Sequence, residues 1–218
     1  MRQLARRHHP QVGQTRAHGI DQSACMPRQA RTPCVAQMPL QIPHPSSGAG
    51  DARCYTARMF TAASLSGDKP QQYAQLAQQA RALLHGEHDR IANAANLSAL
   101  VFNTLPGVNW AGFYFFDGTE LVVGPFQGLP ACVRIPLDKG VCGAAASSRQ
   151  TQRIDDVDAF PGHIACDSAS RSELVIPLLQ GDTLVGVFDI DSPEPARFDV
   201  EDQEGLEAIA RIWVESLS

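Results

Sequence analysis

The hydrophobic residues change from a helical to a strand-like repeat near residue 109, and this change constrains the fold most. Two pairs of apolar segments then follow, each separated by a short Gly/Asp turn: residues 109–116 and 120–123 around Asp117-Gly118, and residues 173–179 and 183–190 around Gly181-Asp182. Apolar runs separated by such a dipeptide are typical of β-hairpins with tight turns. The sequence therefore predicts two antiparallel hairpins.

Helical patterns flank these hairpins. One helix is predicted to begin at Lys69-Pro70 and end before Gly86, and a second follows Asp89, a plausible N-cap. A short helix of small residues over 140–148 and a final helix over about 200–214 complete the set, with further extended pieces at 131–137 and 152–157. The predicted class is α+β: a single domain with a central, largely antiparallel sheet, helices on one face and a pocket under loops on the other.

Residues 1–58 show neither period and are predicted to be a disordered extension. A transit peptide or a twin-arginine signal at Arg6-Arg7 is disfavoured, because the segment lacks an amphipathic pattern and an apolar run. An over-long translation is an alternative, with Met59 as the natural start. The folded domain is expected to span residues 68–218.

Charge and composition restrict the compartment and the partners. The net charge is -5, but residues 1–58 hold 8 Arg against 2 Asp, which leaves about -11 on the remainder. An acidic domain argues against nucleic-acid binding, and no apolar run approaches the roughly 18 residues of a membrane-spanning helix. Six cysteines without a secretory signal favour a reducing cytoplasm, where grouped cysteines indicate metal or redox chemistry.

Three cysteines fall within the patterned part: Cys132, Cys142 and Cys166. Their spacing contains no CxxC pair, so a zinc site is not expected. Cys166 lies in a Gly/Pro/Ser-rich loop beside Asp167 and three residues after His163, which suits a usable thiolate better than buried core packing does. A Cys–His hydrolase would have no use for two further cysteines, whereas thiol redox chemistry would.

Acidic residues gather at one end of the second hairpin. Glu173 opens one strand, and Asp189 and Asp191 end its partner on one face, so antiparallel pairing brings the three acids together. A solvated strand end is the simpler alternative; the functional one is that they hold a substrate ammonium and donate a proton. Trp110 and Tyr114 share the strand face opposite Phe113 and Phe115, where they form either core or a pocket wall.

Seven segments, in order, resemble the free methionine-(R)-sulfoxide reductase family, whose enzymes are built on a GAF domain: NWAGFYFF, LVVGPFQG, ACVRIP, GVCGAA, QRIDDV, GHIACDSASRSELVIPL and GVFDIDS. The resemblance covers about residues 70–217. Generic GAF domains that sense cyclic nucleotides or chromophores share the fold without this cysteine trio and acidic strand end.

The resemblance implies reduction of free L-methionine-(R)-sulfoxide, an oxidative-stress product, with Cys166 as the attacking thiol. Cys132 is the preferred resolving thiol and Cys142 the alternative, and thioredoxin or a similar dithiol recycles the disulfide. Glu173, Asp189 and Asp191 match the acids that bind substrate and donate the proton, and Trp110 and Tyr114 match pocket aromatics. No metal, flavin or nucleotide is implied, and a homodimer is expected by analogy with other GAF domains. A sensing GAF module without turnover is the alternative function.

Overall fold

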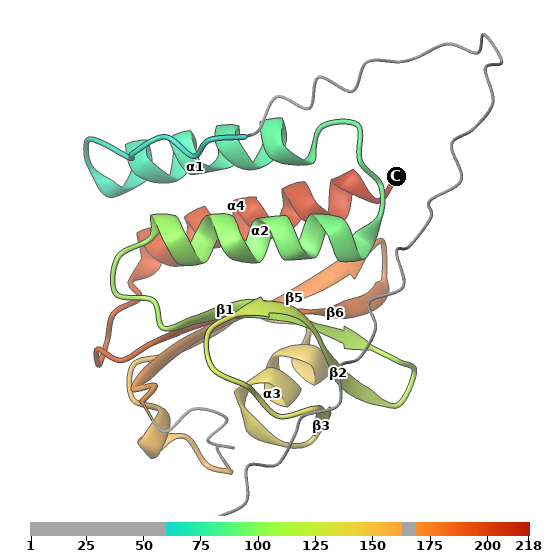
Figure 1. Ribbon diagram of the computed structural model, residues 1–218. Coiled ribbons are helices and arrows are strands. Elements are labelled where there is room, and N and C mark those ends of the chain that lie inside the picture. Colours follow the sequence, from blue (N-terminus) through green and yellow to red (C-terminus); the bar gives the residue numbers. More distant parts are fainter. Residues whose placement is uncertain (1–59, 163–168) are drawn as a thin grey trace, which may run out of the picture. The chain divides into compact units, whose positions relative to one another are not determined.

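Six strands form one sheet in the part of the chain that the structure, a computed structural model, describes: residues 60–162 and 169–218 (Figure 1). The strand order is β3-β2-β1-β6-β5-β4, and each neighbouring pair is antiparallel. The elements are α1 (Lys69–Leu84), α2 (Arg90–Thr104), β1 (Trp110–Phe116), β2 (Glu120–Gln127), β3 (Arg134–Pro136), α3 (Gly140–Ser148), β4 (Gln152–Ile154), the 3-10 helix η1 (Val157–Ala159), β5 (Ser172–Gln180), β6 (Thr183–Ser192) and α4 (Val200–Ser216).

Aspartate side chains begin the three long helices. Asp68 accepts a hydrogen bond from the amide of Gln71, whose side chain bonds back to the Asp68 amide, and Asp199 and Asp202 form the same capping box on α4. Asp89 accepts from two amides of the first turn of α2. Each cap satisfies amide groups that a helix leaves unpaired at its start. The predicted starts of α1 and α2 are confirmed.

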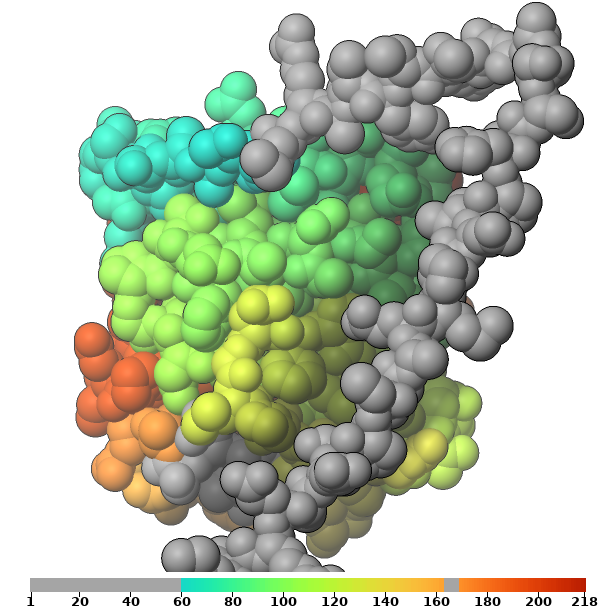
Figure 2. Space-filling view, in the orientation of Figure 1, coloured from blue at the N-terminus to red at the C-terminus, as the bar shows by residue number. Residues whose placement is uncertain are grey.

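The helices lie on both faces of the sheet. The α2 and α4 helices lie against one face with α1 outside them, and α3 lies on the opposite face (Figure 1). Figure 2, in the same orientation, shows α1 residues in blue-green and α2 residues in green forming successive bands of the surface. The predicted α+β class with an antiparallel sheet is confirmed, whereas the prediction that helices cover one face only is wrong, because α3 packs on the other face. Within the described ranges, no helix combines the length and the apolar character needed to cross a membrane.

Alternation along the strands divides the apolar residues into two cores. On β1, Phe113 and Phe115 face the helical layer and pack with Phe188 and Trp213. The intervening side chains face α3, where they form a second cluster that includes Trp110, Tyr114, Cys142, Val175 and Val187. The sequence analysis predicted this division on β1 from the period of two.

Three strand boundaries differ from the predictions by three or more residues. β2 continues through Gln127, because a register shift opposite Phe113 accommodates Gly124 and Pro125, and proline donates no ladder hydrogen bond. β3 begins only at Arg134. β4 ends at Ile154, because the Asp156 side chain accepts from the amide of Asp158 and starts η1. The predicted extension over residues 1–58 lies outside the described residues.

A buried carboxylate joins the start of α1 to the start of α4. The side chain of Asp202, 1% exposed, accepts from the Tyr73 hydroxyl at 2.8 Å, from Lys69 Nζ at 2.7 Å and from Arg197 Nη1 at 3.2 Å. Gly205, one turn along α4, lies against the Tyr73 ring, where a Cβ would come within 2.1 Å of Cγ. This contact fixes the outermost helix on the helical layer.

We expect Asp202→Ala to lower the free energy of unfolding by about 3 kcal/mol, because it removes the carboxylate that pairs with Arg197 and accepts from the buried Tyr73 hydroxyl, and leaves Lys69 paired with Asp199 alone. Urea unfolding followed by circular dichroism measures the change. Glu201→Ala, at the exposed neighbouring position, is the control and should change stability by less than about 0.5 kcal/mol. Equal effects of the two substitutions would contradict this assignment.

Candidate active site

Three acidic side chains meet at one end of the β5–β6 hairpin. Glu173 on β5 is the register partner of Asp191 on β6, and Asp189 lies two residues earlier on the same face. Their exposed fractions are 7% for Glu173, 6% for Asp189 and 8% for Asp191. The alternative of a solvated strand end is therefore wrong. Burying three carboxyl groups together is costly unless protons, hydrogen bonds or a bound cation compensate them.

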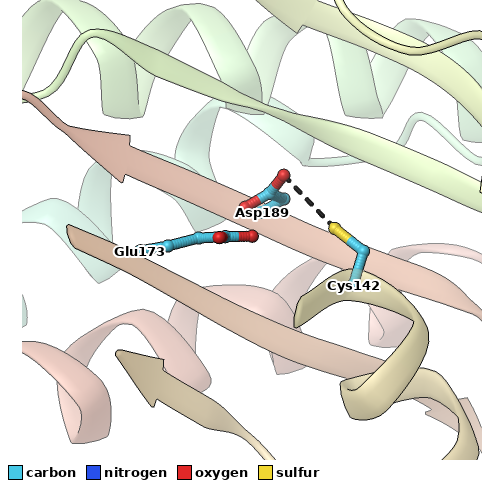
Figure 3. A group of neighbouring side chains, drawn as sticks. All are labelled: Cys142, Glu173 and Asp189. Carbon is cyan, nitrogen blue, oxygen red and sulfur yellow. Dashed lines mark hydrogen bonds between the residues drawn. The ribbon is translucent and has the colours of Figure 1, made fainter. Parts of the chain in front are cut away.

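Cys142 approaches these acids from the helix that covers them. Its Sγ donates to Asp189 Oδ2 at 3.3 Å, and one ligand atom from each of Cys142, Glu173 and Asp189 lies within 4.8 Å of the others. Figure 3 shows the thiol pointing from α3 toward Asp189, with the Glu173 side chain directed toward the same region from the neighbouring strand. Gly143, next to Cys142 on α3, lies against the end of β3, where a Cβ would meet the Pro136 carbonyl oxygen at 2.6 Å.

Burial determines the charges in this cluster. It raises the pKa of Glu173 well above the usual range, and repulsion from Asp189 and Asp191 raises it further. Burial also raises the pKa of Asp189 to about 7, although hydrogen bonds from Cys142 and Glu173 oppose the rise. Two carboxyl groups this close hold one proton between them in preference to ionising together. At neutral pH we therefore assign the proton to Glu173.

The Cys142 thiol is also held in its neutral form. Burial raises its pKa well above the ordinary value, and the negative charge of Asp189 and then Glu173 raises it further. A thiol in these surroundings donates a hydrogen bond and reacts slowly as a nucleophile, because the thiolate is the reactive form. Cys142 therefore suits the binding of other groups better than attack on them.

An aromatic wall stands beside the acids on the same face. Trp110 is the β1 partner of Asp191, and its ring stacks on Tyr114 at 5.8 Å and on Phe126 at 5.2 Å between centroids. Trp110 Nε1 donates to the Leu129 carbonyl at 3.1 Å. Gly112 lies beneath the indole, where a Cβ would come within 2.6 Å of Cη2. The wall is thus fixed on several sides.

Phe126 was missed by the sequence analysis. Its strand was expected to end at Val123, so no signal placed its ring on this wall. Its partner Gly112 was a usable clue, since a glycine between two aromatic residues on a strand marks a place where another ring covers the backbone.

The three cysteines singled out from the sequence do not lie together in the described residues. Cys142 joins the acids, whereas Cys132 lies in the connection between β2 and β3, half-buried against the same apolar cluster. Cys166 lies outside the described residues, as do His163 and Asp167. The described residues therefore bring together Glu173, Asp189, Asp191, Cys142 and the aromatic pair, and the catalytic roles of all these residues stay predictions.

Comparison with known proteins matches this chain to the GAF domain and to similar bacterial proteins. The sequence model of the GAF domain matches residues 74–212. The chain is 53% identical to Protein YtsP of Bacillus subtilis over 163 residues, which are 73% of this chain and 99% of that protein. It is 51% identical to the Free methionine-R-sulfoxide reductase of Escherichia coli over 139 residues, 64% of this chain and 84% of that protein.

Solved structures agree with these relatives. A free methionine-R-sulfoxide reductase from Neisseria meningitidis, in complex with its substrate, aligns with a TM-score of 0.70 and 40% identity over 73% of this chain and 96% of that one. The reduced form of fRMsr from Staphylococcus aureus aligns with a TM-score of 0.65 and 51% identity over 67% and 95% of the two chains.

The charge state of the acids predicts how stability depends on pH. Glu173 and Asp189 bind protons more tightly in the folded than in the unfolded chain, so the stability they contribute is greatest at low pH and is lost as the pH rises, for Asp189 through about 7. For Asp189 alone, stability should fall by about 2 kcal/mol between pH values of about 5.5 and 8. Urea unfolding at the two pH values measures this difference.

A neutral variant isolates this effect. Asp189→Asn removes the titrating carboxyl group and should reduce the pH-dependent difference by more than about half. Glu194→Gln, at an exposed position near the same hairpin end, is the control and should leave it unchanged. The same slope in all three proteins would show that the pKa of Asp189 is not raised in the folded chain.

Proposed function

This chain belongs to the GAF-domain family of free methionine-R-sulfoxide reductases and is an oxidoreductase, and we propose that it reduces free L-methionine-(R)-sulfoxide to methionine through a cysteine nucleophile. The observation that carries the proposal is the buried acid cluster beside the aromatic wall. The acid cluster offers negative charge and a proton, and the aromatic wall offers an apolar surface. A small zwitterion with a methylated sulfur fits both.

Recognition of the free amino acid follows from the charges. An ammonium group bound at Asp191 and Asp189 compensates negative charge that is otherwise buried, as a charge-assisted pair does. The rings of Trp110, Tyr114 and Phe126 receive the methyl group. A methionine sulfoxide within a peptide has no ammonium to offer, so it binds weakly.

The proposed chemistry transfers one oxygen atom. The Cys166 thiolate attacks the sulfoxide sulfur while an acid protonates the oxygen; the sulfur–oxygen bond breaks, and methionine and a Cys166 sulfenic acid result. Glu173 is our choice of proton donor, because burial and its acidic neighbours keep its proton at neutral pH. A second thiol then condenses with the sulfenic acid, forming a disulfide and releasing water.

We propose Cys132 as this second thiol. Cys142 is buried, and its pKa is raised well above the ordinary value beside Asp189. Cys132 is half-buried in a connection between strands, where backbone movement is less costly than within a packed helix such as α3. A thioredoxin-type dithiol then exchanges with the disulfide and is oxidised in turn.

The cellular setting is also a proposal. A cytoplasmic location suits an enzyme whose cysteines must return to the reduced state. A homodimer is proposed by analogy with other GAF domains, and sedimentation velocity of the purified chain measures it.

The direct test is a turnover assay with purified protein, free L-methionine-(R)-sulfoxide and dithiothreitol, measuring methionine. We expect turnover by the natural protein, loss of at least about 1,000-fold in Cys166→Ser, and full activity in Cys25→Ser, the control outside the patterned domain. With thioredoxin as reductant, Cys132→Ser should lose more activity than Cys142→Ser. Binding without turnover would overturn the proposal in favour of a sensing module.

Selectivity tests the role of the acids. N-acetyl-L-methionine-(R)-sulfoxide lacks the ammonium, so its kcat/KM should be about 100-fold lower than that of the free amino acid. Asp191→Asn should lower kcat/KM for the free substrate much more than for the acetylated one. Equal kcat/KM values for both substrates in the natural protein would contradict ammonium recognition by these acids.

A further inference from the structure

Cys142, Glu173 and Asp189 together offer one sulfur and two carboxylate groups to a single point, as the ligands of a metal ion do. We propose that these three side chains form an inhibitory binding site for Zn²⁺, with the thiolate and two carboxylates as ligands and water in the fourth position. The sequence analysis implies no metal cofactor, and the ion proposed here is an inhibitor rather than a cofactor. One sulfur and two carboxylate ligands with an open position are within the range of known zinc sites.

The distances in the cluster suit this ion. Tetrahedral zinc with bonds of about 2.3 Å to sulfur and 2.0 Å to oxygen holds its sulfur and oxygen ligands about 3.5 Å apart. Cys142 Sγ and Asp189 Oδ2 already lie 3.3 Å apart. The ligand atoms of all three residues lie within 4.8 Å, so Glu173 needs only a small movement. Figure 3 shows the three side chains converging on one point.

A second observation points to a ligand at this place. Asp189 Oδ1 is buried and has no hydrogen-bond partner in the described ranges, although Asp189 Oδ2 accepts from the thiol. A buried carboxylate oxygen without a partner is unfavourable, and a metal–oxygen bond satisfies it. Within those ranges, this trio is also the group of His, Cys, Asp and Glu side chains whose ligand atoms lie close enough to share one ion.

The exchange of protons for the ion conserves charge. Zinc binding displaces one proton from the Cys142 thiol and one from the Glu173 carboxyl, and both protons pass to the solvent. Two protons leave as a divalent cation enters, so the net charge of the buried site does not change. No oxidation or reduction occurs. The unchanged net charge favours binding, because placing an uncompensated charge in a buried site is costly.

Inhibition rests on the proposed function, because the substrate ammonium and the ion then require the same carboxylates. Zinc bound at Glu173 and Asp189 also removes the proposed proton donor. We therefore expect Zn²⁺ to inhibit competitively with free methionine-(R)-sulfoxide. Mg²⁺, which prefers oxygen ligands in octahedral geometry, should not inhibit at the same concentration.

Binding is tested with Cd²⁺, whose bonds to thiolate absorb in the ultraviolet. The full chain carrying Cys166→Ser, which cannot use that thiol, should show this band with one equivalent of ion. Adding Cys132→Ser should leave the band unchanged, and adding Cys142→Ser should abolish it. Glu173→Gln should weaken binding by at least about 10-fold. Circular dichroism confirms that each variant is folded.

The outcomes separate this inference from the proposed function. A cadmium band that persists without Cys142, or that is absent in the Cys166→Ser chain, overturns the metal site whatever the enzyme activity. A band that depends on Cys142, in a protein that reduces no sulfoxide, supports the site and counts against the reductase. Binding of zinc without competition by substrate overturns the inhibitory role.

Discussion

Burial of Glu173, Asp189 and Asp191 beside a thiol is the constraint on which the rest of the site depends. Carboxyl groups removed from water ionise together only at a high cost, so the site must hold a proton, a hydrogen-bond donor or a cation. Cys142 supplies one donor, and burial beside two other acids raises the pKa of Glu173, which favours its protonated form. In the proposed function and in the proposed metal site, an ammonium group or a divalent ion meets the same demand.

Apolar packing on the helical face of the sheet offsets the free-energy cost of the buried acids on the other face. The sheet's other face is apolar and covered by α2 and α4, with Phe113, Phe188 and Trp213 at its centre. This apolar burial stabilises the fold, whereas burial of the three carboxyl groups destabilises it. The Asp202 cluster fixes α1 on this layer.

Local signals in the sequence predicted much of this arrangement. Turn dipeptides gave the hairpins, Asp89 gave a helix start, and the spacing of two between Asp189 and Asp191 predicted the shared acidic face. The Cys142–Asp189 contact was not predictable, because it joins α3 to β6 across 47 residues of sequence and has no local signal. Phe126 was missed for a similar reason, since the register shift near Pro125 arises only when β2 pairs with β1.

The central claim is that Glu173 carries a proton at neutral pH inside the cluster. Infrared spectroscopy of protein with isotope-labelled glutamate and aspartate side chains measures this directly, because a protonated carboxyl and a carboxylate absorb in different regions. We predict a protonated glutamate band at neutral pH that disappears in Glu173→Gln and persists in Glu194→Gln. Complete ionisation of every glutamate and aspartate at neutral pH would contradict the account.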